Sequence, residues 1–342
     1  MTDSVVTMVV TEPEGPLVAS VTEPAPPADG WVRVSVTASG VCNADIGTAA
    51  AAGKGIAFPV TPGHEVAGTI AAVGTGVVGW SVGDRVAVGW FGGSCGHCAF
   101  CRVGDVVHCA ERKVPGLSYP GGWAESITVP ADALARIPDG LDFFDAAPFG
   151  CAGVTTFNAI RQANTPAGGR VAVFGLGGLG HLAVQFAHNL GYETIAIARG
   201  ADREKLAKDL GAHHYIDSNA QAPGAALTAL GGADLIVYTA SSTEPVNELL
   251  TGLNVHGQLT LVGVDAGSLT VPAAQLVMNG QIVTGHLTGS ARETEEAMAF
   301  ALTTGVRPMI ERMPLRQAGE AVSRLKAGAP RFRIVLDAAT AQ

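Results

Sequence analysis

One stretch decides the fold of this chain: Arg170-Val-Ala-Val-Phe-Gly175-Leu-Gly-Gly-Leu-Gly180-His-Leu-Ala-Val-Gln-Phe-Ala-His-Asn-Leu190. It opens with a short apolar run that has the length and β-branched bias of a buried strand. Beyond the glycines, apolar residues recur at helical spacing: Leu179, Leu182, Ala183, Phe186, Ala187 and Leu190. The glycines therefore lie on a strand-to-helix turn, the context in which a G-x-G-x-x-G pattern predicts dinucleotide binding.

The chemistry of a bound pyrophosphate explains why such a turn needs several glycines. One glycine allows the tight turn, one lets the backbone approach the pyrophosphate, and one lets the helix pack on the strand. The helix then directs free N–H groups and its positive dipole end at the phosphates. The alternative is a glycine-rich loop without a ligand, since the chain has 45 glycines. We predict cofactor contacts at Gly175, Gly177, Gly178, Leu179 and Gly180.

Length and charge bound the remaining possibilities. With 342 residues, the chain is long for one hydrophobic core, so two domains are expected. The net charge of −9 disfavours nucleic acid and anionic membrane surfaces as partners. No apolar stretch is long enough for a membrane span, and the first residues show no basic start before an apolar core. We therefore expect a cytoplasmic protein.

The first part of the chain reads as a compact, mostly β domain. Short strands are predicted near 5–10, 31–36, 66–73, 85–88 and 126–129. Within this domain lies the pattern C-x2-C-x2-C-x7-C, formed by Cys95, Cys98, Cys101 and Cys109. Four thiolates at this spacing suit a closed tetrahedral zinc that holds a lobe together without doing chemistry. An iron–sulfur cluster and unligated thiols are the competing interpretations.

Two cysteines remain, Cys42 and Cys151, and they are far apart in the sequence. An open catalytic zinc needs a third ligand and keeps one position for substrate. His64, in Pro62-Gly-His-Glu-Val-Ala-Gly68, is the candidate. Taken one at a time, each of these residues is as well explained by a buried cysteine or a turn histidine. Spacing alone does not join them.

The second part of the chain alternates strands and helices. Residues 193–198 read as the second strand of a nucleotide-binding fold, and a helix is predicted over 202–210. An NAD-binding fold normally places an acid at the end of that second strand, on the ribose 2′-hydroxyl. Here Ala198 and Arg199 stand at that point, which favours NADP(H), because arginine can bind a 2′-phosphate. A solvated surface arginine with NAD bound is the alternative. Further strands near 215–216, 235–239, 259–262 and 282–284 predict a parallel doubly wound sheet.

Taken together, these motifs resemble the zinc-containing medium-chain alcohol dehydrogenases. The resemblance runs nearly end to end, through segments 40–45, 62–68, 95–109, 151–155, 175–181 and 333–337. It implies an α/β protein with a GroES-like β-rich catalytic domain and a six-stranded Rossmann domain. The implied boundaries are 1–153 for the catalytic domain with both zinc sites, 154–286 for the Rossmann domain, and 287–342 for a return to the catalytic domain.

The resemblance also assigns roles to individual residues. Cys42, His64 and Cys151 become catalytic zinc ligands, and Glu65 an alternate ligand. Asp45 becomes the carboxylate that accepts the second ring N–H of His64. Further cofactor contacts are implied at Thr155, Val264 and Arg333, although Phe332 replaces the glycine usual before that arginine. An apolar substrate pocket is implied at Trp90, Phe91, Tyr119 and Leu287, with core packing as the alternative.

Two residues depart from the family pattern. Ala44 stands where the family has Ser or Thr, and Gly47 where it commonly has His, so both proton-relay members are missing. We expect reversible hydride transfer between NADP(H) and an aldehyde, ketone or alcohol, in a cleft between the domains that holds one of two zinc ions. The missing relay raises reduction of cyclic imines as an alternative, since an iminium already carries its proton. A non-catalytic nucleotide-binding protein is the third hypothesis. A homodimer or homotetramer is expected.

Overall fold

The computed structural model describes residues 4–49, 58–263 and 267–339. It contains two compact units, one formed by Met1–Val154 with Thr288–Gln342 and the other by Thr155–Leu287. The helix α4 (Ala152–Arg161) carries the chain from the first unit into the second. None of the described helices is long and apolar enough to cross a membrane.

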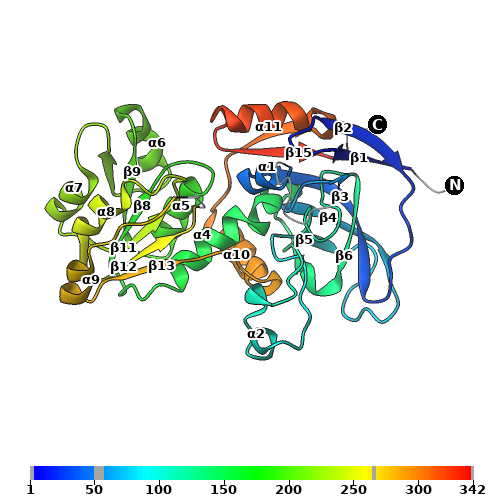
Figure 1. The fold of residues 1–342 in the computed structure, drawn as a ribbon, viewed down its shortest axis with the longest axis horizontal. Coiled ribbons are helices and arrows are strands. Elements are labelled where there is room, and N and C mark those ends of the chain that lie inside the picture. Colours follow the sequence, from blue (N-terminus) through cyan, green and yellow to red (C-terminus); the bar gives the residue numbers. More distant parts are fainter. Residues whose placement is uncertain (1–3, 50–57, 264–266, 340–342) are drawn as a thin grey trace. The chain divides into compact units, whose positions relative to one another are not determined.

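The first unit is built on mostly antiparallel sheet, with one parallel pair, β14 and β15 (Figure 1). Its strands run in the order β14-β15-β3-β4-β5-β7, with β6 paired to β3 and β1 paired to β2 in a separate ribbon. The strands are β1 (Val5–Val10), β2 (Leu17–Thr22), β3 (Trp31–Val41), β4 (Val66–Val73), β5 (Arg85–Val88), β6 (Ser126–Pro130), β7 (Leu134–Arg136), β14 (Ile310–Pro314) and β15 (Arg333–Asp337). The helices are α1 (Asn43–Ala49), α2 (Ala99–Arg102), α3 (Phe143–Ala146), α10 (Ala291–Thr304) and α11 (Ala318–Lys326).

Alternating burial explains most of these strands. Every second residue of β1 is buried, and most of β3 faces a core shared with Trp123 and Ile70. The strand β2 was not predicted, because its apolar residues do not alternate and most of its side chains are exposed. The closing strand β15 pairs with β3 and β14, so residues from the two ends of the chain lie side by side.

A carboxylate links the last elements of this unit. The side chain of Glu311 in β14 accepts a hydrogen bond from the Arg331 N–H at 2.8 Å and pairs with Arg324 of α11. The Arg331 N–H contributes most to lowering the pKa of Glu311, and Arg324 lowers it further.

The second unit is a single parallel sheet of six strands in the order β10-β9-β8-β11-β12-β13. That is the doubly wound order of a dinucleotide-binding fold, so the predicted Rossmann sheet is confirmed. Its strands are β8 (Arg170–Phe174), β9 (Glu193–Ala198), β10 (His214–Asp217), β11 (Ala233–Tyr238), β12 (Leu253–Leu261) and β13 (Ile282–Gly285). Its helices are α5 (Gly180–Asn189), α6 (Glu204–Asp209), α7 (Pro223–Ala229), α8 (Val246–Leu249) and α9 (Ala273–Asn279).

The strand order reverses between β8 and β11, and this reversal positions the nucleotide site. In open parallel sheets, ligands bind outside the carboxyl ends of the strands at such a switch point. The glycine turn follows β8 directly, and α5 begins at Gly180.

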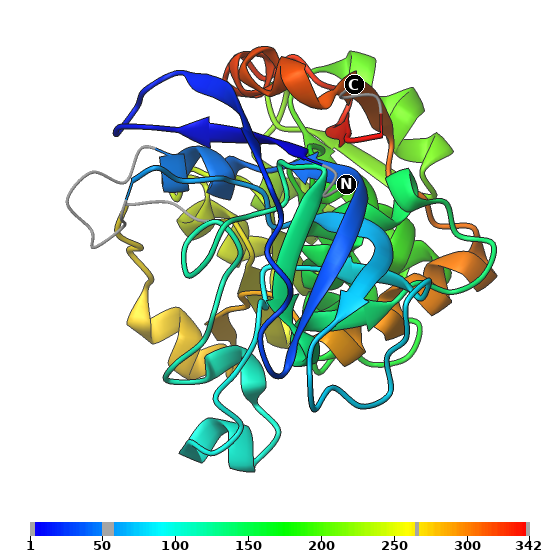
Figure 2. The ribbon, with the colours of Figure 1, turned by 90° about the vertical axis from the view of Figure 1, so that its right-hand side faces the viewer.

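One lobe of the first unit is set apart from its sheets. Residues 95–109 carry α2 and a short 3₁₀ helix (Val106–His108) and project away from the β-rich part of the unit in both views (Figure 1, Figure 2).

Candidate active site

The structure brings together three residues that the sequence could not join. The ligand atoms of Cys42, His64, Glu65 and Cys151 all lie within 4.8 Å of one another. Cys42 follows the end of β3, His64 precedes β4, and Cys151 follows a 3₁₀ helix at 147–150. Cys42 is 8% exposed and His64 is 1% exposed. Two sulfurs and an imidazole nitrogen in a buried cluster are donors that suit zinc.

Asp45 organises this cluster through both of its oxygens. Its Oδ1 accepts hydrogen bonds from the Gly63 N–H at 3.0 Å and from His64 Nδ1 at 2.7 Å. Its Oδ2 accepts a hydrogen bond from the Cys42 N–H at 3.0 Å. With the proton on Nδ1, His64 Nε2 carries a free lone pair, and this buried atom has no hydrogen-bond partner among the described residues. A metal ion fits that orphaned acceptor.

The electrostatics of the cluster follow from burial and close packing. The hydrogen bond from Cys151 lowers the pKa of the Cys42 thiol and raises that of Cys151. Burial lowers the pKa of His64, but Asp45 and Cys42 together raise it above its ordinary value. Burial raises the pKa of Glu65 to about 7, although the neighbouring Arg333 opposes the change.

Sequence reasoning missed a buried ion pair beside the cluster. Arg333, at the start of β15, places its NH2 group 2.5 Å from both oxygens of Glu65, and the two side chains are 5% and 0% exposed. A Cβ at Gly40 would lie 2.0 Å from Glu65 Oε2, so this pair needs a glycine on β3. The predicted cofactor role of Arg333 and alternate-ligand role of Glu65 stay predictions. No pattern in the sequence links positions 268 residues apart.

The four remaining cysteines form a second cluster, in the projecting lobe. The ligand atoms of Cys95, Cys98, Cys101 and Cys109 lie within 4.8 Å of one another. Sulfur-to-sulfur distances are 3.6 Å for 98–101 and 95–109, and 4.0 Å for 95–101. A tetrahedral zinc with bonds of about 2.3 Å would hold its sulfurs about 3.8 Å apart. The arrangement therefore fits the predicted closed site. Burial, followed by the neighbouring sulfurs, raises the pKa of Cys101 to about 11. Backbone N–H groups lower the pKa of Cys98 to about 6.

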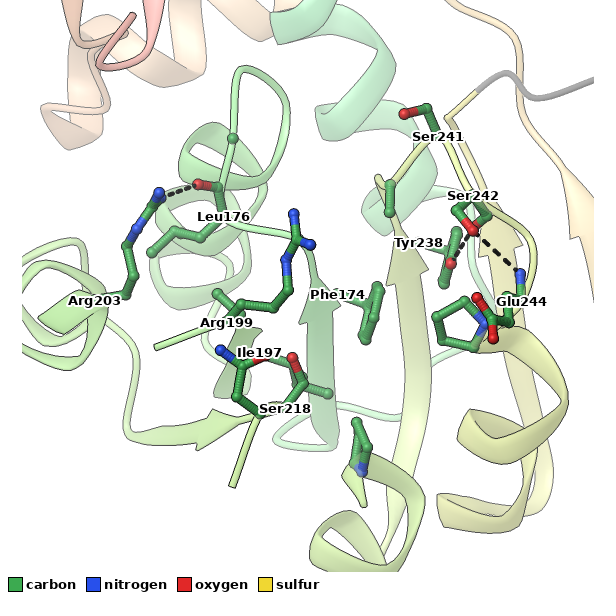
Figure 3. Close-up of a pocket in the computed structure, with 17 residues that line it drawn as sticks. Phe174, Leu176, Ile197, Arg199, Arg203, Ser218, Tyr238, Ser241, Ser242 and Glu244 are labelled. Atoms are coloured by element: carbon green, nitrogen blue, oxygen red, sulfur yellow. Dashed lines mark hydrogen bonds between the residues drawn. The ribbon is translucent and has the colours of Figure 1, made fainter. Parts of the chain in front are cut away.

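The glycine turn of the second unit borders a pocket of about 570 Å³ (Figure 3). Residues at the carboxyl ends of four strands line it: Phe174, Gly175, Leu176, Gly177, Ile197, Ala198, Arg199, Ser218, Asn219, Tyr238, Ala240 and Ser241 among them. Gly175 has a φ of +97°, and a Cβ at Gly180 would lie 1.7 Å from the Gly175 carbonyl oxygen. A Cβ at Gly177 would meet nothing within 4 Å. The space beside this glycine is therefore open, and a ligand can approach the backbone of the turn there. Gly178 and Leu179 complete the turn before α5.

Two arginines reach this pocket. Arg199 follows β9, and its guanidinium projects into the pocket in Figure 3. Arg203, which sequence reasoning missed, also lines the pocket and donates a hydrogen bond to the Leu176 carbonyl at 3.1 Å. Its place four residues after Arg199, at the start of a helix, was the signal that could have identified it.

The other predicted cofactor contacts are less informative. The Thr155 hydroxyl donates to the Leu287 carbonyl oxygen at 3.4 Å. Val264 lies outside the described residues.

Of the predicted substrate-pocket residues, Trp90 lies beside His64, in the cluster of Cys42, His64, Glu65 and Cys151. Its ring stands edge-on to the His64 ring, with centroids 5.0 Å apart and an interplanar angle of 89°. Phe91 is 3% exposed. Tyr119 donates its hydroxyl to the Gly92 carbonyl at 2.8 Å and packs edge-on against Trp31, which are the contacts of a core residue. Burial accordingly raises the pKa of Tyr119. Leu287 is 38% exposed at the end of the second unit.

Comparisons with known proteins agree with this architecture. Residues 28–139 match the family model of the alcohol dehydrogenase GroES-like domain, and residues 178–303 match that of zinc-binding dehydrogenases. The chain is 42% identical to alcohol dehydrogenase patD of Penicillium expansum over 305 residues, 89% of each chain. It is 34% identical to NADP-dependent alcohol dehydrogenase C 1 of Mycolicibacterium smegmatis over 318 residues, 90% of each. The structure of a cinnamyl alcohol dehydrogenase from Sorghum bicolor superimposes with a TM-score of 0.90 and 30% identity over 99% of both chains.

The fold and these matches define an oxidoreductase built from a GroES-like domain and a Rossmann domain. The chain belongs to the zinc-containing medium-chain alcohol dehydrogenases. The resemblance drawn from its motifs is therefore confirmed.

Proposed function

We propose that the chain is a zinc-dependent, NADP(H)-linked alcohol dehydrogenase that also acts as a carbonyl reductase on aldehydes and ketones. One observation carries the proposal: Cys42, His64 and Cys151 converge, with the Nε2 lone pair of His64 buried among their sulfurs. Three such ligands leave a fourth position for substrate. In this proposal, segments 1–153 and 287–342 form the catalytic domain, and 154–286 the cofactor domain.

Each residue of the cluster has a separate task in the proposed reaction. When bound, zinc supplies a Lewis acid that polarises the substrate oxygen, and the nicotinamide supplies or accepts the hydride. Asp45 fixes the tautomer and orientation of His64 and also holds the backbone of Cys42. The ring of Trp90 forms one wall of the proposed substrate site, next to His64. The indole N–H of Trp90 is buried and is accepted by none of the described residues, so it is available to a bound substrate.

The preference for NADP(H) rests on the charges around the nucleotide pocket. No carboxylate ends β9, since Ala198 stands there, while Arg199 and Arg203 both line the pocket. Guanidinium groups bind phosphate with bidentate, charge-assisted hydrogen bonds. An NADP-dependent relative with 34% identity supports the same preference.

The second zinc is proposed for the four-cysteine lobe. Its ligands form a complete thiolate set, so it would hold the lobe together without contributing an open position. The alternative of a non-catalytic nucleotide-binding protein is not retained, because Cys42, His64 and Cys151, the three ligands that a catalytic zinc needs, are all present in one cluster.

Metal analysis and initial rates test the proposal together. We expect two zinc ions per chain in the purified protein and faster turnover with NADPH than with NADH across a panel of aldehydes, ketones and alcohols. Cys42→Ala should lose turnover and one zinc ion, whereas Cys98→Ala should lose the other zinc ion and much of the stability. A Cys42→Ala variant that retains full activity would refute the role of the cluster.

Reduction of C=N bonds is a second candidate activity. It is favoured by two residues of the helix α1, Ala44 and Gly47, which stand where the family has its proton relay. Ala44 and Gly47 carry no group that can move a proton, and the hydroxyl of the nearby Thr48 donates to the Ala44 carbonyl at 3.0 Å. An iminium substrate brings its own proton and needs no relay. Ala44→Ser restores the hydroxyl of the family, so it should raise carbonyl reduction without raising reduction of a cyclic imine. Absence of imine turnover in the wild-type chain removes this candidate.

A further inference from the structure

A third group of potential ligands lies on the exposed side of the cysteine lobe. The ligand atoms of Cys95, His97 and Glu111 lie within 4.8 Å of one another. His97 Nε2 and the Glu111 carboxylate are 3.9 Å apart, and their side chains are 75% and 66% exposed. So long and exposed an ion pair contributes almost nothing to stability. Stability therefore does not explain why the His97–Glu111 pair lies beside the thiol of Cys95.

Cys95 belongs to both ligand groups. Its sulfur lies 3.6 Å from Cys109 Sγ and 4.0 Å from Cys101 Sγ, within the closed set. Glu111 is tied to that set by its own backbone, because its N–H donates to Cys109 Sγ at 3.3 Å. The two groups therefore keep a fixed relation to each other, with one sulfur in common.

The two groups differ in exposure. Cys109, in the closed set, is 4% exposed. The side chains of His97 and Glu111 stand in solvent, on a lobe that projects from its unit, and are accessible to a hydrated metal ion (Figure 2). Imidazole nitrogen, carboxylate oxygen and thiolate sulfur together bind zinc and cobalt but leave coordination positions open.

We propose that Cys95, His97 and Glu111 form a capture site for a zinc-class divalent ion, from which the ion enters the four-cysteine set. The inference rests on the proposed function, because it requires that this set binds metal. In the transfer, the bond to Cys95 is kept and the bonds to His97 and Glu111 break. Bonds to Cys98, Cys101 and Cys109 form, and each of these thiols that is protonated releases its proton to solvent. No redox change is involved.

The same lobe provides a matched control. His108 and Asp105 form a second exposed pair, with Nδ1 and Oδ1 2.7 Å apart and side chains 56% and 42% exposed. Within the part of the chain that the structure describes, this pair belongs to no group of three metal ligands. Removing His108 therefore removes a surface histidine of the lobe without touching the proposed site.

Cobalt uptake by the metal-free full-length chain tests the proposal. Stopped-flow absorption of the thiolate-to-cobalt band reports filling of the cysteine set, and a Cys42→Ala/Cys151→Ala background removes both sulfurs of the other cluster, which limits the signal to that set. We expect His97→Ala/Glu111→Gln to slow uptake by about tenfold at limiting Co²⁺, the scale on which supporting ligands change metal affinity. The final absorption should equal that of the parent chain, and His108→Ala should fill at the parent rate.

The possible outcomes distinguish failure of the capture site from failure of the four-cysteine metal site. An unchanged rate in the double variant overturns the capture site and leaves the four-cysteine metal site standing. A lower final absorption also overturns it, because the two residues would then be ligands of the filled site. If the parent chain shows no thiolate-to-cobalt band at all, the proposed metal role of the cysteine lobe fails as well.

Discussion

Arg199 offers the sharpest test of how the chain selects its cofactor. We predict that Arg199→Ala lowers kcat/KM for NADPH and leaves kcat/KM for NADH nearly unchanged. The guanidinium projects into the nucleotide pocket and makes no hydrogen bond or ion pair with any residue that the structure describes (Figure 3). Its removal therefore breaks no hydrogen bond or ion pair with the described residues, so that the change in rate reports the interaction with the ligand.

The expected size follows from the exposure of this arginine. A hydrogen bond to a charged group contributes about 1.5–3 kcal/mol, which corresponds to about 10- to 150-fold in kcat/KM. Arg199 lies at the surface, where water and salt screen the charge, so the lower part of that range applies. We expect a loss of about 10- to 30-fold with NADPH, shrinking as ionic strength rises.

Arg203 provides the comparison that makes this result interpretable. Its guanidinium also donates to the Leu176 carbonyl within the glycine turn, so Arg203→Ala loosens the turn itself. We expect that variant to lose activity with both cofactors. Arg292→Ala, which removes an 84% exposed guanidinium in the other unit, controls for the change in net charge.

The assay is initial-rate kinetics with one carbonyl substrate and both cofactors at two salt concentrations. Equal losses with NADPH and NADH in Arg199→Ala would show that this arginine does not recognise the 2′-phosphate. The NADP(H) assignment would then lose its main support.

Three further predictions follow from contacts in the site and the fold. Asp45→Asn should lower zinc affinity by about 10- to 100-fold, measured by competition with a chelator, because an amide cannot accept all three N–H groups; unchanged affinity would contradict the orienting role. Gly180→Ala should destabilise the chain by about 1–3 kcal/mol in urea unfolding. Gly177→Ala should leave stability within about 0.5 kcal/mol but weaken NADPH binding, and equal stability losses would contradict the assignment of the two glycines. The hydrogen bond from the Arg331 N–H lowers the folded-state pKa of Glu311, so its stabilisation is complete above the unfolded pKa and is lost as pH falls. Glu311→Gln should therefore cost about 1 kcal/mol at pH 7, with the gap shrinking once pH falls below the unfolded pKa of about 4.3 and closing below the folded pKa, whereas a pH-independent gap would contradict the linkage.

Local sequence signals were sufficient wherever one segment carries the whole pattern. The run from Arg170 to Leu190 contains its own strand, turn and helix, so the nucleotide-binding turn could be predicted without any other part of the chain. The cysteines at 95–109 are equally local, because four ligands within one short loop leave little freedom in how they meet. The charge at Arg199 could be read for the same reason, since its distance from the turn sets its place at the end of β9.

Tertiary structure decided everything that depends on long-range approach. Cys42, His64 and Cys151 meet because strand pairing and the connections beside it bring three separate segments to one point, and no spacing rule describes that. The Glu65–Arg333 pair depends on β15 returning to β3, from the far end of the chain. Side-chain periodicity reports which face of an element is buried, but the partner across the core is chosen by packing and by the pairing of distant strands. The sequence therefore determined which residue types could bind a metal, and the tertiary structure determined that Cys42, His64 and Cys151 meet at one point.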